Sequence, residues 1–201
     1  MKSGYVAIVG RPNVGKSTLL NHLVGQKISI TSRRPQTTRH RIHGIRTTEE
    51  GQAVFVDTPG IHASAKRAMN RYLNKTAGSA LGDVDVVVWM IDRAAWLPED
   101  ELVLQRIRTA GAPVILAINK IDRIEDKDQL LPFLQGAAER FDFAAMIPLS
   151  ALKGSNLDVL DRAIMNLLPA GDPIFPEDQV TDRSMRFMAA DRDWEQAPQR
   201  V

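Results

Sequence analysis

The chain has 201 residues, of which 44% are hydrophobic and 25% charged, with a net charge of +2 and no cysteine. This balance is that of a globular protein with one full core; it excludes fibrous and wholly disordered classes, and the missing cysteines exclude disulfide bonds and thiolate zinc sites. The apolar run 84–91 contains Asp85 and falls far short of the roughly 20 residues that cross a bilayer, and residues 1–5 lack the layout of a signal peptide. We therefore expect a cytoplasmic protein without an integral membrane segment. Peripheral contact with the inner membrane stays open.

The first expected strand, 5–9, leads into a glycine-rich loop and a helix at 17–24. The loop, 10–17, satisfies the phosphate-binding pattern Gly-x-x-x-x-Gly-Lys-Ser. Glycines let the backbone approach phosphates, Lys16 reaches the β- and γ-phosphates, and Ser17 can ligate Mg²⁺. A plain glycine-rich turn with a surface lysine is the alternative. The candidate nucleotide-binding residues of this segment are Gly10, Asn13, Val14, Gly15, Lys16, Ser17 and Thr18.

Two strands are expected next, at 42–48 and 52–56, and the turn signal between them predicts an antiparallel pair. Asp57-Thr58-Pro59-Gly60 follows, which puts Asp57 at the carboxyl end of a strand, where open α/β sheets bind ligands. Asp57 can hold the Mg²⁺ shell there, and Gly60 offers an N–H to a γ-phosphate. The same residues are also good turn formers without a nucleotide.

A helix is expected at 67–81, a buried strand at 84–91 and a helix at 99–109. The next buried strand, 114–118, ends at Asn119-Lys120-Ile121-Asp122. The Asp122 carboxylate can accept hydrogen bonds from the adjacent N1–H and 2-amino donors of guanine, and adenine has no such pair. The segment therefore predicts a preference for GTP over ATP, with Asn119 bracing the loop and Lys120 lying along the base.

The remaining elements are a helix at 126–141, a strand at 144–149 and a helix at 156–167. Backbone N–H groups of Ser150, Ala151 and Leu152, after that last strand, can face the guanine carbonyl oxygen, although helix capping is the alternative for such residues. The order of elements predicts an α/β P-loop fold with a mostly parallel six-stranded sheet, one antiparallel strand and helices on both faces.

Prolines and acidic residues after Pro169 indicate that the domain ends near residue 170. We expect residues 1–170 to form one domain, an exit linker to follow it, and 191–201 to be a loose tail without periodicity.

With motifs at 10–17, 35–40, 57–60, 119–122 and 150–152, the chain resembles the Era-type family of bacterial, translation-factor-related P-loop GTPases. This resemblance implies a GTP-hydrolysing switch that acts in small ribosomal subunit assembly, with a KH domain that binds small-subunit rRNA after the GTPase domain. A KH domain uses a Gly-x-x-Gly loop, and no two glycines in this chain lie three positions apart. We therefore expect the RNA-binding domain to be missing. By this resemblance, residues 1–170 are the GTPase domain, 171–190 are a linker and the start of a truncated second domain, and 191–201 are a disordered tail or one foreign to the family.

The resemblance also implies catalytic and metal-binding roles. Lys16, Thr38 and Gly60 are the catalytic candidates, and Ser17, Thr38 and Asp57 are the Mg²⁺ candidates, with Thr37 an alternative to Thr38. Ile61 stands where Ras-like enzymes have the glutamine that orients the attacking water, so slow intrinsic turnover is expected. Family members that bind K⁺ through the loop asparagine suggest the same for Asn13.

Two other functions are compatible with these residues. One is a GTP-binding regulatory module without significant hydrolysis, which Ile61 favours, and the other is a P-loop ATPase, which Asp122 disfavours. The basic run 32–41 is read as a solvated loop rather than an RNA contact.

Overall fold

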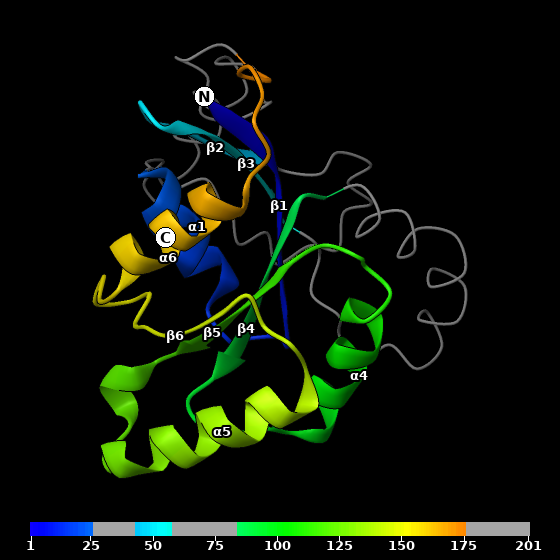
Figure 1. The fold of residues 1–201 in the computed structure, drawn as a ribbon. Coiled ribbons are helices and arrows are strands. Elements are labelled where there is room, and N and C mark those ends of the chain that lie inside the picture. Colours follow the sequence, from blue (N-terminus) through cyan, green and yellow to red (C-terminus); the bar gives the residue numbers. More distant parts are fainter. Residues whose placement is uncertain (26–42, 58–83, 176–201) are drawn as a thin grey trace, which may run out of the picture.

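The computed structural model describes residues 1–25, 43–57 and 84–175, and in this part of the chain six strands form one sheet between two layers of helices (Figure 1). The strand order is β2-β3-β1-β4-β5-β6, and every neighbouring pair is parallel except β2 and β3. The predicted fold class is therefore confirmed. The strands are β1 Lys2–Gly10, β2 His43–Thr47, β3 Gly51–Asp57, β4 Val86–Asp92, β5 Val114–Asn119 and β6 Ala145–Pro148.

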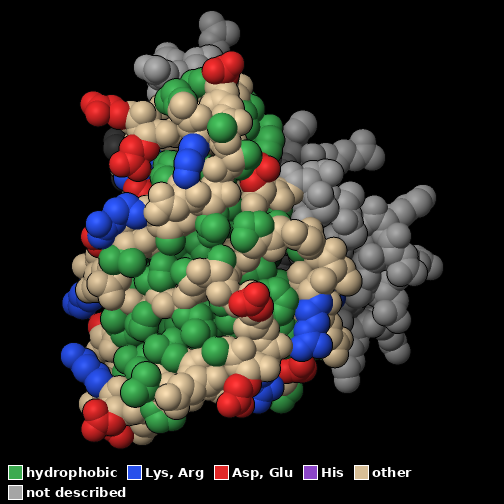
Figure 2. All heavy atoms as spheres, viewed as in Figure 1, with side chains coloured by type: hydrophobic (Ala, Val, Ile, Leu, Met, Phe, Trp, Pro, Cys, Tyr) green, Lys and Arg blue, Asp and Glu red, His purple; other side chains and the backbone are tan. Residues whose placement is uncertain are grey.

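Alternate residues of the central strands face two separate cores, because side chains of a strand point to opposite faces in turn. On one face, Val88 packs with α1 (Lys16–Val24) and α6 (Leu157–Leu167). On the other, Trp89 packs with α4 (Pro98–Ile107) and α5 (Leu130–Arg140). Sequential runs such as VVVWMI are buried on both sides for this reason, as is typical of central parallel strands. On the surface seen in Figure 2, hydrophobic side chains gather in the middle and charged ones lie mainly around the rim.

The helix expected at 126–141 is shorter in the structure. A turn of 3₁₀ helix, Lys127–Gln129, comes first, and the Asp126 side chain accepts a hydrogen bond from the backbone N–H of Asp128 at 3.0 Å. Pro132 explains the later start of α5: proline has no N–H and is tolerated only in the first turn of a helix.

Strand β1 begins at Lys2 instead of residue 5, because Lys2 and Ser3 are paired with Gly51 and Gln52 of β3. The segment 169–175 runs beside this end of the sheet. Gly171 donates a backbone hydrogen bond to the Met1 carbonyl at 3.1 Å, and the N-terminus and the end of the described chain lie side by side in Figure 1. The first residues of the expected linker are thus hydrogen-bonded to the domain.

Gln52 of β3 binds this segment through its side chain. Its side chain is fully buried, and its amide oxygen accepts from the backbone N–H groups of Ile174 and Phe175 at 2.8 and 2.9 Å. The amide nitrogen donates to the Phe175 carbonyl at 2.9 Å and to the Thr47 hydroxyl at 3.0 Å. One side chain therefore connects β2, β3 and the segment that leaves the domain.

Several expectations lie outside the described residues: the helix at 67–81, the basic run 32–41, Ile61, and everything from 176 onward. Within the described part, no helix combines the length and the apolar character needed to cross a membrane.

Candidate nucleotide-binding site

The loop between β1 and α1 has a conformation that its glycines permit. Gly10 and Gly15 have φ angles of 146° and 105°, and Asn13 has a φ of 64°. A Cβ atom on Gly15 would collide with the side-chain amide of Asn119, so this position combines a left-handed backbone with a close approach. The Lys16 ammonium donates to the carbonyl oxygens of Gly10 and Arg11, at 3.0 and 2.8 Å. The loop thus curls around the lysine that is expected to meet phosphate.

An ion pair holds this loop from outside the pocket. The Arg11 Nε lies 2.9 Å from Oδ1 of Asp100, which is fully buried in the first turn of α4. The other carboxylate oxygen accepts from the backbone N–H of Leu97 at 3.0 Å, at the start of the same helix. Burial raises the pKa of the Asp100 carboxyl, and the Leu97 N–H and the Arg11 charge oppose that rise. Sequence reasoning missed this contact: Asp100 fits a helix-capping position, and nothing local points to Arg11.

Asn119, at the end of β5, joins three loops. Its buried side-chain amide donates to the Val14 carbonyl at 2.6 Å and accepts from the backbone N–H of Ala151 at 2.9 Å. The amide supplies both a donor and an acceptor, which a carboxylate could not do. The phosphate-side loop, the 119–122 segment and the 150–152 segment are therefore held together by one residue.

Lys120 has a left-handed backbone with φ 63°. Its ammonium donates to the Asn13 carbonyl at 2.8 Å and to Oδ2 of Asp92 at 2.9 Å. The aliphatic stem therefore crosses from β5 to the phosphate-side loop, along one wall of the pocket.

Asp122 is oriented by a residue of the last motif. The Ser150 hydroxyl donates to Oδ1 of Asp122 at 2.5 Å and accepts from the backbone N–H of Lys153 at 3.2 Å. The pKa of Asp122 is lowered, chiefly because this hydrogen bond favours the ionised carboxylate. A carboxylate that stays ionised is the form that can accept two hydrogen bonds from guanine.

These segments enclose a pocket of about 410 Å³, within the size range of small-molecule sites. Three predicted residues do not line the pocket but bind residues that do. The carbonyl oxygens of Gly10 and Val14 accept hydrogen bonds from Lys16 and Asn119, and the Ser150 hydroxyl donates to Asp122. Arg123 is the lining residue that sequence reasoning missed, since a single basic residue in a turn carries no signal. The pocket is lined by Asn13, Gly15, Lys16, Ser17, Thr18, Asn119, Lys120, Asp122, Arg123, Ala151 and Leu152.

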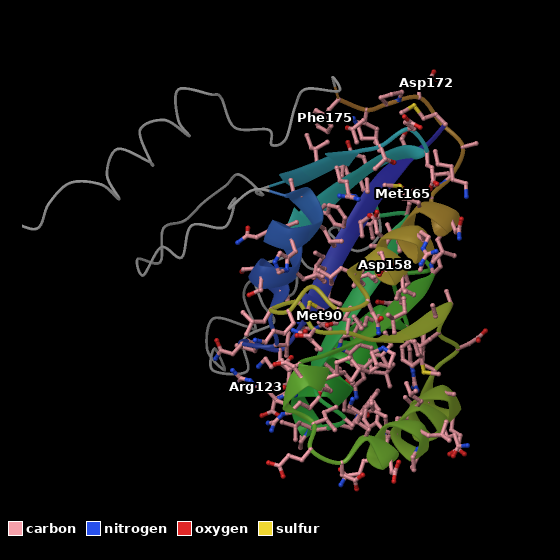
Figure 3. All side chains as sticks on the ribbon, turned by 90° about the vertical axis from the view of Figure 1, so that its left-hand side faces the viewer. Met90, Arg123, Asp158, Met165, Asp172 and Phe175 are labelled. Atoms are coloured by element: carbon pink, nitrogen blue, oxygen red, sulfur yellow. The ribbon has the colours of Figure 1, made fainter. Side chains whose placement is uncertain are left out.

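Of the remaining predicted residues, the structure describes the backbone of Asp57. The backbone of Asp57 ends β3 and is in register with Ile8 of β1, two residues before the phosphate-side loop begins. Thr37, Thr38 and Gly60 lie outside the described residues. Figure 3 shows Arg123 toward one end of the sheet and Asp172 and Phe175 at the opposite end. The pocket and the chain exit thus lie far apart.

A Gly-x-x-x-x-Gly-Lys-Ser loop between the first strand and helix, with Asn-Lys-x-Asp at the end of a parallel strand, defines a P-loop nucleotide-binding domain of the GTPase class. Residues 5–120 match the family described as 50S ribosome-binding GTPase. The chain belongs to this family.

Two relatives carry the resemblance further. GTPase Era of Azotobacter vinelandii is 58% identical over 191 residues, covering 95% of this chain and 64% of the relative. GTPase Era of Pseudomonas aeruginosa is 56% identical over 190 residues, covering 94% of this chain and 62% of the relative. The resemblance to Era-type GTPases is confirmed, and the chain spans less than two thirds of the length of these relatives.

Solved structures agree with this assignment. An Aquifex aeolicus Era variant bound to GDP and AlF4⁻ superposes with a TM-score of 0.81 at 45% identity, covering 94% of this chain and 65% of that one. Era in complex with MgGDPNP and a segment of 16S ribosomal RNA has the same TM-score and coverage at 44% identity. These neighbours bind a guanine nucleotide, one of them with magnesium.

Proposed function

We propose that this protein is a GTP-binding and GTP-hydrolysing switch, with residues 1–170 as the GTPase domain, 171–190 as linker and start of a second domain, and 191–201 as a tail. The observation that carries the proposal is the joint placement of Lys16 and Asp122 in one pocket. One end offers an ammonium and backbone N–H groups to phosphates, and the other offers an oriented carboxylate to guanine.

The described residues support roles in binding and orienting the nucleotide. Lys16 is held by two carbonyl oxygens and balances charge on the β- and γ-phosphates, since phosphoryl transfer requires mostly positioning and charge stabilisation. Asp122 accepts from the guanine N1–H and 2-amino groups, while the backbone of Ala151 and Leu152 faces the carbonyl oxygen. Asn119 keeps these parts in fixed relation.

Magnesium fits the donor set of this site. Ser17 lines the pocket, and Asp57 ends the strand next to β1; hydroxyl and carboxylate oxygens are the ligands that Mg²⁺ prefers. We propose Ser17, Asp57 and Thr38, or its neighbour Thr37, as the residues that hold the ion, which when bound neutralises phosphate charge. Gly60 would contact the γ-phosphate.

Two parts of the proposal rest on the relatives. The ribosomal RNA in one neighbouring structure supports a role with the small ribosomal subunit. The proposed location is the cytoplasm, and peripheral contact with the inner membrane stays open. Potassium at Asn13 is a further hypothesis; equal hydrolysis in sodium and potassium buffers of matched ionic strength would remove it.

The decisive experiment measures phosphate release from GTP by the wild-type chain and by Lys16→Ala, with and without the 3′ end of 16S rRNA. We expect slow release that Lys16→Ala abolishes. Competition assays with GDP and ADP test the base, and stronger competition by ADP would contradict the role of Asp122. Binding of GTP without release would favour the second candidate, a regulatory module, for which Ile61 is the supporting feature.

A further inference from the structure

Asp92 is a charged residue beside the pocket that belongs to none of the nucleotide-binding motifs. It is the last residue of β4, and its backbone is in register with Asn119 at the end of β5. Its carboxylate is about one-fifth exposed, and Oδ2 lies 2.9 Å from the Lys120 ammonium. The same ammonium donates to the Asn13 carbonyl at 2.8 Å. The three groups form a bridge from β4 through Lys120 to the phosphate-side loop.

The backbone at the ends of β4 and β5 brings the Asp92 carboxylate and the Lys120 ammonium together. Lys120 and Arg93 both have left-handed backbones, with φ of 63° and 53°, and the Arg93 N–H donates to the Asn119 carbonyl at 2.8 Å. β4 and β5 therefore end in linked turns that put Asp92 beside the lysine stem. Asp92 is not itself among the pocket-lining residues, and its other oxygen, Oδ1, lies 3.3 Å from the exposed guanidinium of Arg93. Of the two cations paired with Asp92, Lys120 is the one that lines the pocket.

Neither partner of this ion pair is fully buried, and such pairs add little to folding stability. What the pair restricts is the position of the lysine. A lysine side chain has four rotatable bonds. Without the carboxylate, the Lys120 ammonium could donate only to the Asn13 carbonyl, among the described residues, and to water. The carboxylate thus fixes the stem against the wall of the pocket.

We propose that Asp92 is a positioning residue for guanine-nucleotide binding: it holds Lys120 on the Asn13 carbonyl, so that the base side and the phosphate side of the pocket keep a fixed separation. This inference rests on the proposed guanine-nucleotide function.

The test measures the dissociation rate of a fluorescent GDP from the wild type and from Asp92→Asn, which preserves side-chain size. We expect dissociation to accelerate about two- to fivefold, the range that corresponds to the coupling of a partly exposed ion pair. Asp158→Asn is the control, because it also replaces the carboxylate of an ion pair by an amide, in this case an exposed pair with Arg162 of α6 that lies outside the pocket. We expect that control to dissociate GDP at the wild-type rate.

A double-mutant cycle shows whether Asp92 acts through Lys120. In a Lys120→Met background, Asp92→Asn should cause no further acceleration; an equal acceleration with and without the lysine would overturn the proposal. The Lys120→Met variant removes the other partner of the same ion pair. The ratio of GDP to IDP affinity should stay at the wild-type value in Asp92→Asn, because Asp122 reads the 2-amino group.

The outcomes distinguish a failure of the proposed guanine-nucleotide function from a failure of the positioning role of Asp92. A wild type that binds no guanine nucleotide refutes the proposed function itself. A wild type that binds GDP, with Asp92→Asn dissociating at the wild-type rate, refutes only the positioning role.

Discussion

Replacing Gln52 by alanine tests how strongly one side chain holds Ile174 and Phe175 against the sheet. The substitution removes four hydrogen bonds from a fully buried amide, two of which join the backbone N–H groups of Ile174 and Phe175. Each hydrogen bond contributes about 0.5–1.5 kcal/mol net, and the two N–H groups regain water once the segment detaches. We therefore expect the free energy of unfolding to fall by roughly 2–4 kcal/mol.

Two measurements check this expectation. Urea denaturation reports the change in free energy, and hydrogen exchange reports the protection of the backbone amides of Ile174 and Phe175. Both amides should exchange slowly in the wild type and rapidly in Gln52→Ala. Gln129→Ala is the matched control, because that side chain is exposed and makes a single 3.2 Å hydrogen bond to Asp126. A variant as stable as this control, with both amides still protected, would refute the reasoning.

Three other substitutions probe the pocket. Ser150→Ala should weaken GDP binding about two- to tenfold, as for one lost hydrogen bond; because the Ser150 hydroxyl lowers the pKa of Asp122, binding should also fail at a higher pH on acidification than in the wild type, which a titration from pH 7 to 4 measures. Arg11→Met leaves Asp100 buried without its counter-charge. It should lower the free energy of unfolding by roughly 2–4 kcal/mol near neutral pH, somewhat less than the loss of one partner from a fully buried ion pair. Because burial raises the pKa of Asp100 above its unfolded value, the neutral acid is the tolerated form, so the loss should shrink as pH falls toward 4; a pH-independent loss in denaturation curves would contradict this. Gly15→Ala places a methyl group against a packed amide on a left-handed backbone, and calorimetry should detect no GDP binding; near-wild-type affinity would show that the loop adjusts.

Much of the fold could be predicted because its signals are local. Buried parallel strands are short β-branched runs, such as Val114–Asn119, and the Glu49-Glu50-Gly51 turn allows only a hairpin between its neighbours. Boundaries that depend on distant partners could not be predicted. β1 extends to Lys2 because β3 lies beside it, and α5 begins late because Asp126 favours a 3₁₀ turn before Pro132.

The chemistry of the pocket could be read from the sequence, because strands end at the same edge of a parallel sheet and the polar residues after them must meet there. Lys16, Asn119 and Asp122 are found from their motifs together with this rule. The contacts that hold these residues in place became known only from the folded arrangement. The pairs Asp92–Lys120, Arg11–Asp100 and Gln52–Ile174 are separated by 28, 89 and 122 residues, and no local pattern encodes such contacts. Side chains that bind a ligand follow motifs, whereas those that position them depend on how the elements pack.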